Sequence, residues 1–294
     1  MTNDLKQFIA EQLPKIESEL YDLVECIKAP ESLKESMLYS LKAGGKRIRP
    51  LFVLAVCELF HNKQQEAFTV GTAVEMIHTY SLIHDDLPSM DNDDMRRGKP
   101  TNHVVFGEAL ATLAGDALNT LSFGVLARMK NVEASKKVEL INLLSIASGA
   151  EGMVGGQVLD IDGESRRLNL AELEHVHMNK TGAILRFSIE SGAVLSDATE
   201  AEREALVEYA HHIGLAFQIQ DDILDIVGTS EELGKTAGKD IESHKSTYPA
   251  LLTLEGAKEK LEEHYQQAIS ALEKIEKNTS LLEEFANYIV KRNN

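Results

Sequence analysis

MIHTYSLIHDDLPSMD, residues 76–91, joins an apolar helical run to a cluster of aspartates. The apolar side chains recur at helical spacing, and Asp85 and Asp86 follow them directly. Pro88 must end or bend this helix, because proline lacks the backbone donor and clashes with the preceding turn. The chain is then expected to return Asp91 towards Asp85. The stretch therefore predicts an apolar helix whose C-terminal end carries an acidic site.

A second acidic cluster ends another apolar run, FQIQDDILDIVG at residues 217–228. Asp221 and Asp225 are four residues apart and share a helix face, where like charges cost about 0.2–0.5 kcal/mol. A solvated acidic face or helix-capping aspartates would explain either cluster alone. Two clusters, each ending an apolar helix, favour neutralisation by cations. Hard carboxylate oxygens suit Mg²⁺, which bridges carboxylates to substrate phosphates.

Helical periodicity extends over most of the remaining chain. The chain has only six prolines, none of them between Pro100 and Pro249, and it shows no sustained alternation of strand type. Hydrophobic residues make up 43% of the 294 residues and charged residues 26%, which is ordinary for a globular protein with a sizeable core. We therefore predict an all-α protein, a single large helical bundle whose one domain spans residues 1–294.

Charge and cysteine content exclude several classes of protein. A formal net charge of −17 argues against nonspecific binding to nucleic acid or anionic lipid, since both attract basic surfaces. Cys26 and Cys57 match no zinc-site spacing, which favours a reducing compartment. Residues 1–20 carry charges throughout, unlike a signal peptide, and we expect no apolar stretch of about 18 residues to span the membrane. A cytoplasmic protein is predicted.

Positive charge is concentrated in a few glycine-flanked places. GGKRIRP, residues 44–50, is expected to open a helix, where free backbone N–H groups favour anions. The other cations are Arg96, Arg97, Lys180 beside Thr181, and Lys235. Each would also fit a surface salt bridge, and GGK lacks the spacing of a Walker A loop. Arginine forks suit bidentate phosphate contacts, so the pattern favours bound phosphate groups.

The charges balance if the two acidic clusters clamp a diphosphate through metal. About three Mg²⁺ ions, with Arg96, Lys180 and Lys235, would neutralise the aspartates of both clusters and a bound diphosphate. A second diphosphate would then be held without metal. The residues available for it are Lys46, Arg49, His78 and Arg97. Two phosphorylated substrates are therefore predicted.

A series of motifs resembles, in family order, the trans-prenyltransferase (polyprenyl diphosphate synthase) family. They are GGKRIRP (44–50), DDLPSMDNDDMRRGKPTNH (85–103), AGDAL (114–118), GGQVLDIDGE (155–164), HMNKTGA (177–183), FQIQDDILDIVG (217–228), LGKTAGKD (233–240) and HKSTYPALL (244–252). The two extra residues within the first DDxxxxD resemble the bacterial farnesyl diphosphate synthases.

The resemblance implies a helical bundle around a deep central apolar cavity, commonly as a homodimer. It also implies a Mg²⁺-dependent head-to-tail condensation. Isopentenyl diphosphate would be joined to dimethylallyl and then geranyl diphosphate, which gives farnesyl diphosphate and releases diphosphate.

The resemblance also implies a role for each matching residue. The metal ligands would be Asp85, Asp91 and Asp221, supported by Asp86, Asp222 and Asp225. Isopentenyl diphosphate would be bound by Lys46, Arg49, His78 and Arg97. The allylic diphosphate would be bound by Arg96, Lys180, Thr181, Gln218 and Lys235, with Lys245 a weaker candidate. Of these, the catalytic group that stabilises the departing diphosphate is Lys180, Thr181, Gln218 and Lys235. Lys291 and Arg292 are interpreted as solvated charges of the C-terminal tail, with help in closing the isopentenyl diphosphate site as the alternative.

Product length is expected to depend on Tyr80. It lies five residues before Asp85, about 7 Å down a helix axis at 1.5 Å per residue, and a bulky residue there would stop chain growth at C15. An ordinary core tyrosine with a satisfied hydroxyl is the alternative. The nearest rival function is a C20 (geranylgeranyl) diphosphate synthase. A terpene cyclase is disfavoured because the chain has no Trp and only 5% aromatic residues, and an inactive partner subunit because neither acidic cluster is missing.

Overall fold

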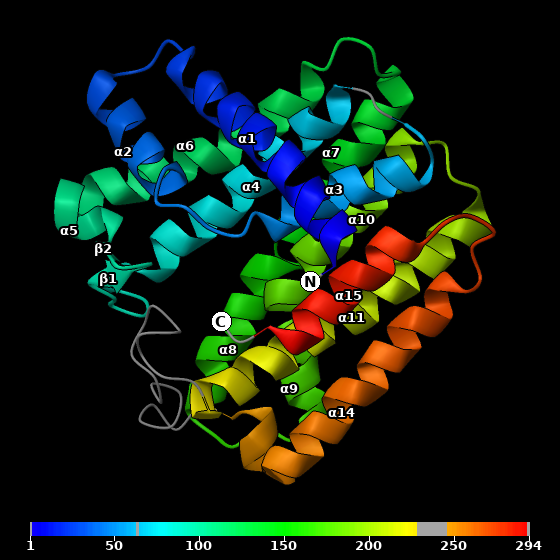
Figure 1. Ribbon diagram of the computed structural model, residues 1–294. Coiled ribbons are helices and arrows are strands. Elements are labelled where there is room, and N and C mark those ends of the chain that lie inside the picture. Colours follow the sequence, from blue (N-terminus) through cyan, green and yellow to red (C-terminus); the bar gives the residue numbers. More distant parts are fainter. Residues whose placement is uncertain (1, 63–64, 228–245, 293–294) are drawn as a thin grey trace.

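The computed structural model describes residues 2–62, 65–227 and 246–292, and the described chain is almost entirely helical (Figure 1). The first half contains α1 (Asn3–Glu25), α2 (Glu31–Leu41), α3 (Ile48–Leu59), α4 (Glu66–Asp85), β1 (Met95–Arg96), β2 (Lys99–Pro100), α5 (Asn102–Phe106), α6 (Glu108–Ala127) and α7 (Ala134–Ser148). The second half contains α8 (Met153–Glu164), α9 (Leu170–His177), the π-helix η1 (Met178–Gly182), α10 (Ala183–Leu195), α11 (Glu200–Val227), α14 (Tyr248–Leu272) and α15 (Ser280–Lys291). The prediction of an all-α fold is confirmed.

Helix α4 is the central element of the bundle. Its buried residues point in all directions, as expected for a helix that is apolar all round. It contacts α1, α2, α3, α6 and α10, which surround it in Figure 1. The buried apolar side chains form one contiguous core that runs from Leu5 in α1 to Ile289 in α15. The helix that carries the first acidic cluster is therefore held on every side.

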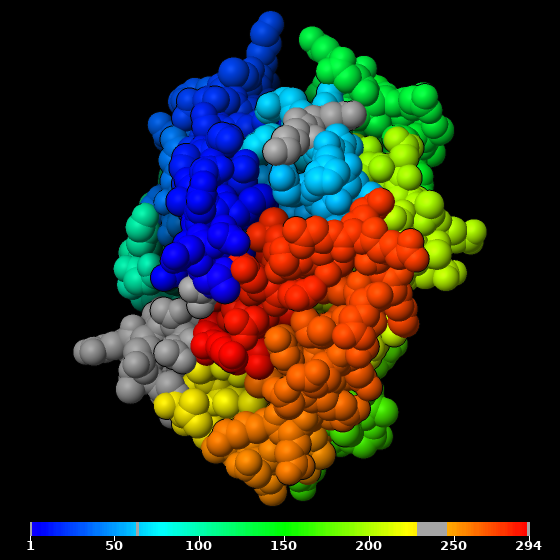
Figure 2. Space-filling model, turned by 45° about the vertical axis from the view of Figure 1, so that its right-hand side comes forward, coloured from blue at the N-terminus to red at the C-terminus, as the bar shows by residue number. Residues whose placement is uncertain are grey.

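Helices α11, α14 and α15 form the other side of the molecule. α14 runs beside α11, and α15 lies between α1 and α14 on the face shown in Figure 2. The fully buried Tyr209 of α11 donates its hydroxyl to the carbonyl of Leu282 in α15 at 2.7 Å. The backbone N–H of Leu5 donates to Glu284 at 3.0 Å, so the start of α1 is fixed to α15. The C-terminal helix is thus an integral part of the bundle.

Helix α6 corrects one expectation. Among the described residues it alone is long and apolar enough, by length and composition, to cross a membrane, and 39% of its most apolar stretch is buried. The core helix of a globular protein passes the same test. α6 packs along α4 through Ala111, Ala114 and Leu118, all fully buried, which explains its apolar character.

Candidate active site

The first acidic cluster begins where α4 ends. α4 stops at Asp85, before Pro88, and the backbone N–H of Asp91 donates to the carbonyl of Asp85 at 2.9 Å. The next turn is closed in the same way, because the N–H of Asp93 donates to the carbonyl of Asp86 at 3.2 Å. The prediction that Pro88 would end the helix and return Asp91 to Asp85 is confirmed.

His84 anchors this end of α4 to α6. Its Nε2 lies 3.0 Å from the carbonyl of Thr112. A Cβ on Gly115 would lie 2.2 Å from the same Nε2, so only glycine leaves room for the imidazole. Gly115 of the AGDAL motif therefore leaves the space that the imidazole of His84 occupies. The interpretation of His84 as a hydrogen-bonding residue of the helix end agrees with this contact.

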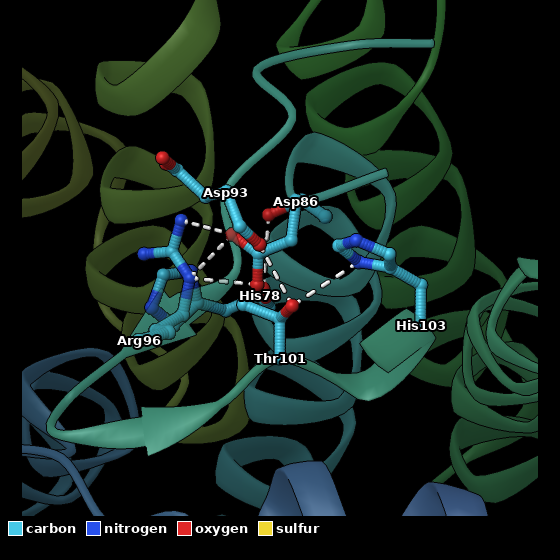
Figure 3. A network of polar contacts seen from close by, with 7 residues as sticks. His78, Asp86, Asp93, Arg96, Thr101 and His103 are labelled. Atoms are coloured by element: carbon cyan, nitrogen blue, oxygen red, sulfur yellow. Dashed lines mark hydrogen bonds and ion pairs between the residues drawn. The ribbon is translucent and has the colours of Figure 1, made fainter. Parts of the chain in front are cut away.

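Asp86 is buried and bound by Arg96. The Nε and Nη2 of Arg96 lie 2.8 and 2.7 Å from Oδ1 of Asp86, and Figure 3 shows this pair beside the hydroxyl of Thr101. That hydroxyl donates to the carbonyl of Asp93 at 2.7 Å. Burial raises the pKa of Asp86, and the hydrogen bonds from Arg96 oppose the rise. Arg96 thus holds Asp86 and keeps its guanidinium beside the acidic cluster.

Asp85 lies at the wall of a cavity of about 550 Å³. Burial raises the pKa of Asp85 to about 6; Lys180 opposes this shift and Asp91 adds to it. Burial disfavours the charged form of this carboxylate, and a bound cation would favour it. Asp85 is therefore the residue through which the acidic cluster faces the cavity.

The cavity walls below Asp85 are largely apolar. α8 contributes Met153, Val154, Val158 and Ile161, and the loop after α4 contributes Leu87 and Met90. Tyr80 lines the same cavity and is only 7% exposed; its ring packs edge-on against His84 at 5.3 Å. The predicted apolar cavity is confirmed.

Lys180 and Thr181 lie on the π-helix η1 and line the same cavity as Asp85. π-turns are rare and are frequent at functional sites. The Nζ of Lys180 lies 2.6 Å from Oδ2 of Asp160. A Cβ on Gly156 would lie 2.1 Å from the backbone nitrogen of Lys180, so α8 approaches η1 too closely for any side chain. Gly156 therefore permits the close packing of α8 against η1 that positions Lys180 and Thr181.

A basic group lies beside the cavity at the start of α3. Gly44 and Gly45 have φ values of 92° and 135°, which other residues rarely adopt. The guanidinium of Arg97 rests on Gly45 and donates to the carbonyl of Gly44. Arg49 lines the cavity, burial lowers its pKa, and its Nε has no partner among the described residues. The two glycines bring Arg97 to the start of the helix that carries Arg49.

His78 completes this basic group. It lines the cavity, and burial lowers its pKa well below the ordinary value; the positive charges of Arg49 and Arg97 add to the shift. Burial also lowers the pKa of Lys46. The structure thus brings Arg49 and Arg97 close enough to act on His78, whereas the charges that act on Lys46 are those of Arg292 and Asp221. Arg47, in the same motif, points into the core, where its Nη1 lies 2.7 Å from Oε1 of Glu75.

The second acidic cluster lies in the last turns of α11. Asp222 is buried and accepts the backbone N–H of Tyr248 at 2.9 Å. Asp225 is also buried, and neither of its oxygens has a partner within the described part of the chain. Asp221 is half-exposed, and its charge raises the pKa of Arg49 against the larger effect of burial. Arg49 lines the cavity together with Asp85, and Asp221 acts on Arg49 electrostatically, but none of the three aspartates of α11 lines the cavity itself.

The structure describes three of the remaining predicted residues and leaves two outside the described ranges. Gln218 is described, and its Nε2 lies 3.4 Å from Nδ1 of His177. Lys235 and Lys245 lie outside the described residues. Lys291 is exposed, as expected for a tail charge, but Arg292 is 7% exposed and binds Asp221. The interpretation of Arg292 as a solvated charge is therefore wrong.

The family model for polyprenyl synthetase matches residues 30–283 of this chain. The chain belongs to this family. It is a prenyltransferase, as its motifs predict.

Several members of the polyprenyl synthetase family are similar over nearly all of the chain. A farnesyl diphosphate synthase of Bacillus subtilis (strain 168) is 51% identical over 294 residues, which are 99% of this chain and 99% of that protein. A chloroplastic geranylgeranyl pyrophosphate synthase of Capsicum annuum is 45% identical over 99% of this chain and 79% of that protein. The crystal structure of an FPP/GFPP synthase from Zymomonas mobilis has a TM-score of 0.86 at 39% identity, covering 99% of this chain and 100% of that one.

The residues present fit the magnesium on which polyprenyl synthetases depend. Within residues 2–62, 65–227 and 246–292, no three His, Cys, Asp or Glu side chains converge on one point. The two clusters offer carboxylate oxygens at Asp85, whose pKa burial raises, and at the buried Asp225, whose oxygens have no partner among the described residues. All the donors are hard oxygens, which Mg²⁺ prefers, with its other positions left to water and phosphate.

Three residues at the candidate site of this polyprenyl synthetase were not given these contacts by the sequence analysis. Gln157 lines the cavity, Asp160 holds Lys180, and Arg292 binds Asp221. The first two belong to GGQVLDIDGE, where their spacing of three residues on a helix was a usable signal. Nothing in the tail sequence distinguishes Arg292 from a solvated charge.

Proposed function

We propose that this prenyltransferase condenses isopentenyl diphosphate with dimethylallyl and then geranyl diphosphate, which gives farnesyl diphosphate and diphosphate. One observation carries the proposal. A single apolar cavity has Asp85 with Lys180 at one part of its wall and Arg49 with His78 at another, so two anionic head groups and an apolar chain can occupy it together.

The allylic diphosphate is assigned to the acidic part of the wall. Lys180 and Thr181 line the cavity from η1. Gln218 contacts His177, the residue that precedes η1, and Arg96 binds Asp86. Asp85, Asp91 and Asp221 are the proposed ligands of about three Mg²⁺ ions, which when bound would neutralise the diphosphate and so make it a better leaving group. Lys235 remains a proposed member of this group. The protein cations near the bridging oxygen stabilise the charge that develops as the bond breaks.

Isopentenyl diphosphate is assigned to Lys46, Arg49, His78 and Arg97. No metal is required there, because the group is basic; burial lowers the pKa of His78, and the neighbouring cations lower it further, so the imidazole adds no charge. In the reaction the allylic C–O bond breaks with both electrons going to diphosphate. The double bond of isopentenyl diphosphate then supplies the electrons of the new C–C bond. A proton leaves the resulting cation, and we assign its acceptance to the released diphosphate. The apolar walls exclude water, which would otherwise capture the allylic cation.

Product length is assigned to Tyr80. The side chain lines the cavity on the helix that carries Asp85, one and a half turns before it. Tyr80→Ala is expected to give products longer than C15, because the growing chain then passes the site of the ring. Tyr80→Phe keeps the ring and is expected to keep C15. Product analysis of both variants tests this, and an unchanged C15 product from Tyr80→Ala would remove Tyr80 from the role.

A coupling assay tests the function as a whole. The enzyme is supplied with Mg²⁺, labelled isopentenyl diphosphate and one starter at a time: dimethylallyl, geranyl or farnesyl diphosphate. Incorporation from the first two but not from farnesyl diphosphate is expected. Efficient extension of farnesyl diphosphate would support the C20 alternative. A cyclic hydrocarbon product would indicate a cyclase, and no incorporation an inactive subunit.

The remaining assignments follow from the same proposal. We assign the chain to one domain, to the cytoplasm and to a homodimer. The homodimer is assigned because the family whose motifs the chain carries is commonly homodimeric. Sedimentation analysis at micromolar concentration is expected to show twice the mass of the chain.

A further inference from the structure

The C-terminal end of the described chain reaches the second acidic cluster. Arg292 follows α15, and its Nη2 lies 2.7 Å from Oδ1 of Asp221 and 2.9 Å from the carbonyl oxygen of Phe217. Its guanidinium carbon lies 3.9 Å from the centre of the Phe217 ring. Gln220 donates to the carbonyl of Arg292 at 2.9 Å, which fixes the backbone as well. Four separate contacts therefore hold one cation against α11.

The contact falls on the carboxylate proposed to bind metal. Asp222 already accepts a backbone N–H, and Asp225 has no partner among the described residues. Arg292 thus supplies a positive charge at Asp221, where a metal ion would otherwise supply it. The same guanidinium contributes, after burial, to the lowered pKa of Lys46, so its charge also acts on the basic group.

We propose that Arg292 is a built-in counter-ion of Asp221 that is exchanged for Mg²⁺ with its diphosphate. This inference rests on the proposed metal site. A carboxylate oxygen that accepts a charge-assisted hydrogen bond from Arg292 is less available to a metal ion, so the two cations compete. Arg292 has φ −67° and ψ 150°, outside the helix, so its side chain can leave without unwinding α15. By thermodynamic linkage, Mg²⁺ binding must weaken the contact of Arg292 with Asp221 by the same factor by which that contact weakens Mg²⁺ binding.

Calorimetric titration of Mg²⁺ tests the exchange, with the full chain and saturating inorganic diphosphate as the probe. Arg292→Met removes the charge and keeps an apolar side chain over Phe217. It is expected to bind Mg²⁺ about tenfold more tightly than the unchanged protein, since a competing charged hydrogen bond is lost. Lys291→Met is the matched control: it removes the same charge from the neighbouring, exposed residue and is expected to change the affinity less than twofold.

A second readout uses stability and does not depend on activity. Without Mg²⁺, Arg292→Met is expected to unfold at a lower temperature than the Lys291→Met control. With saturating Mg²⁺ and diphosphate, the difference is expected to disappear, because Arg292 is then already displaced. Arg292→Lys keeps the charge without the fork geometry and is expected to fall between the two, which provides a testable variant if Arg292→Met does not fold.

Two outcomes would overturn the inference, and Asp221→Asn separates them. If Asp221→Asn weakens Mg²⁺ binding while Arg292→Met and Arg292→Lys leave it unchanged or weaker, the exchange is wrong and the metal site stands. If Asp221→Asn leaves Mg²⁺ binding unchanged, Asp221 is not a metal ligand. In that case the proposed metal site and the exchange both fail.

Discussion

Gly156→Ala tests whether the position of η1 sets the reaction rate. A Cβ at Gly156 would lie 2.1 Å from the backbone nitrogen and 2.5 Å from the Cα of Lys180. These are backbone atoms, so relief requires α8 and η1 to separate by about 1 Å at the contact. Overpacking of this kind costs about 1–3 kcal/mol of stability. Displacement of Lys180 and Thr181 by about 1 Å is expected to lower kcat by about 100-fold.

The assay compares kcat and the unfolding temperature for the same preparations. Gly214→Ala is the matched control: Gly214 also faces η1, but its added Cβ would lie 3.4 Å from the Cα of Gly182, an ordinary contact. That variant is expected to keep kcat within about threefold and to remain folded. Should Gly156→Ala be folded at the assay temperature and turn over as fast as Gly214→Ala, the reasoning about η1 would be refuted.

Three further predictions concern buried charge. Burial lowers the pKa of His264 from 6.5 to about 4, so the unfolded chain binds more protons than the folded chain between these pH values. The free energy of unfolding is therefore expected to be unaffected by His264 above pH 6.5 and to fall by about 1–3 kcal/mol as the pH approaches 4. Chemical unfolding at each pH is expected to show a smaller decrease for His264→Gln. Asp225→Asn removes a buried charge that has no partner among the described residues, and is expected to raise the metal-free unfolding temperature while it weakens Mg²⁺ binding; a lower unfolding temperature would contradict this. Arg47→Met leaves Glu75 buried without its cation and is expected to cost about 3–5 kcal/mol, most of it recovered when Glu75→Leu is added.

The sequence was sufficient for the helical fold and for the order of the acidic and basic motifs. Periodicity revealed the helices, and Pro88 predicted the return of Asp91, because both depend on local sequence. The separate directions of Arg47 and Arg49 could not be predicted, since they depend on Glu75 from another helix. Arg292 was misinterpreted for the same reason: its partners on α11 are more than 70 residues away, and tertiary contact decides its environment.

The π-turn and its glycine neighbour illustrate the same limit. HMNKTGA mixes good helix formers such as Met178 and Lys180 with poor ones such as Gly182, and it gives no local signal for a π-helix. The widened turn occurs where α8 presses on η1 through Gly156, a contact between segments that are not adjacent in sequence. The chemical character of the candidate site could therefore be predicted, whereas the backbone geometry that presents it could not.

Tyr80 and Asp85 share one rigid helix, and this arrangement has a consequence for fidelity. In the proposed reaction Asp85 positions the diphosphate head group at one end of α4, and Tyr80 limits the hydrocarbon tail at a fixed distance along the same helix. α4 is enclosed by five other helices, so thermal motion of surface loops does not alter the distance between the two ends. Substitutions elsewhere in the molecule are then expected to change how fast the enzyme works without blurring the length of what it makes.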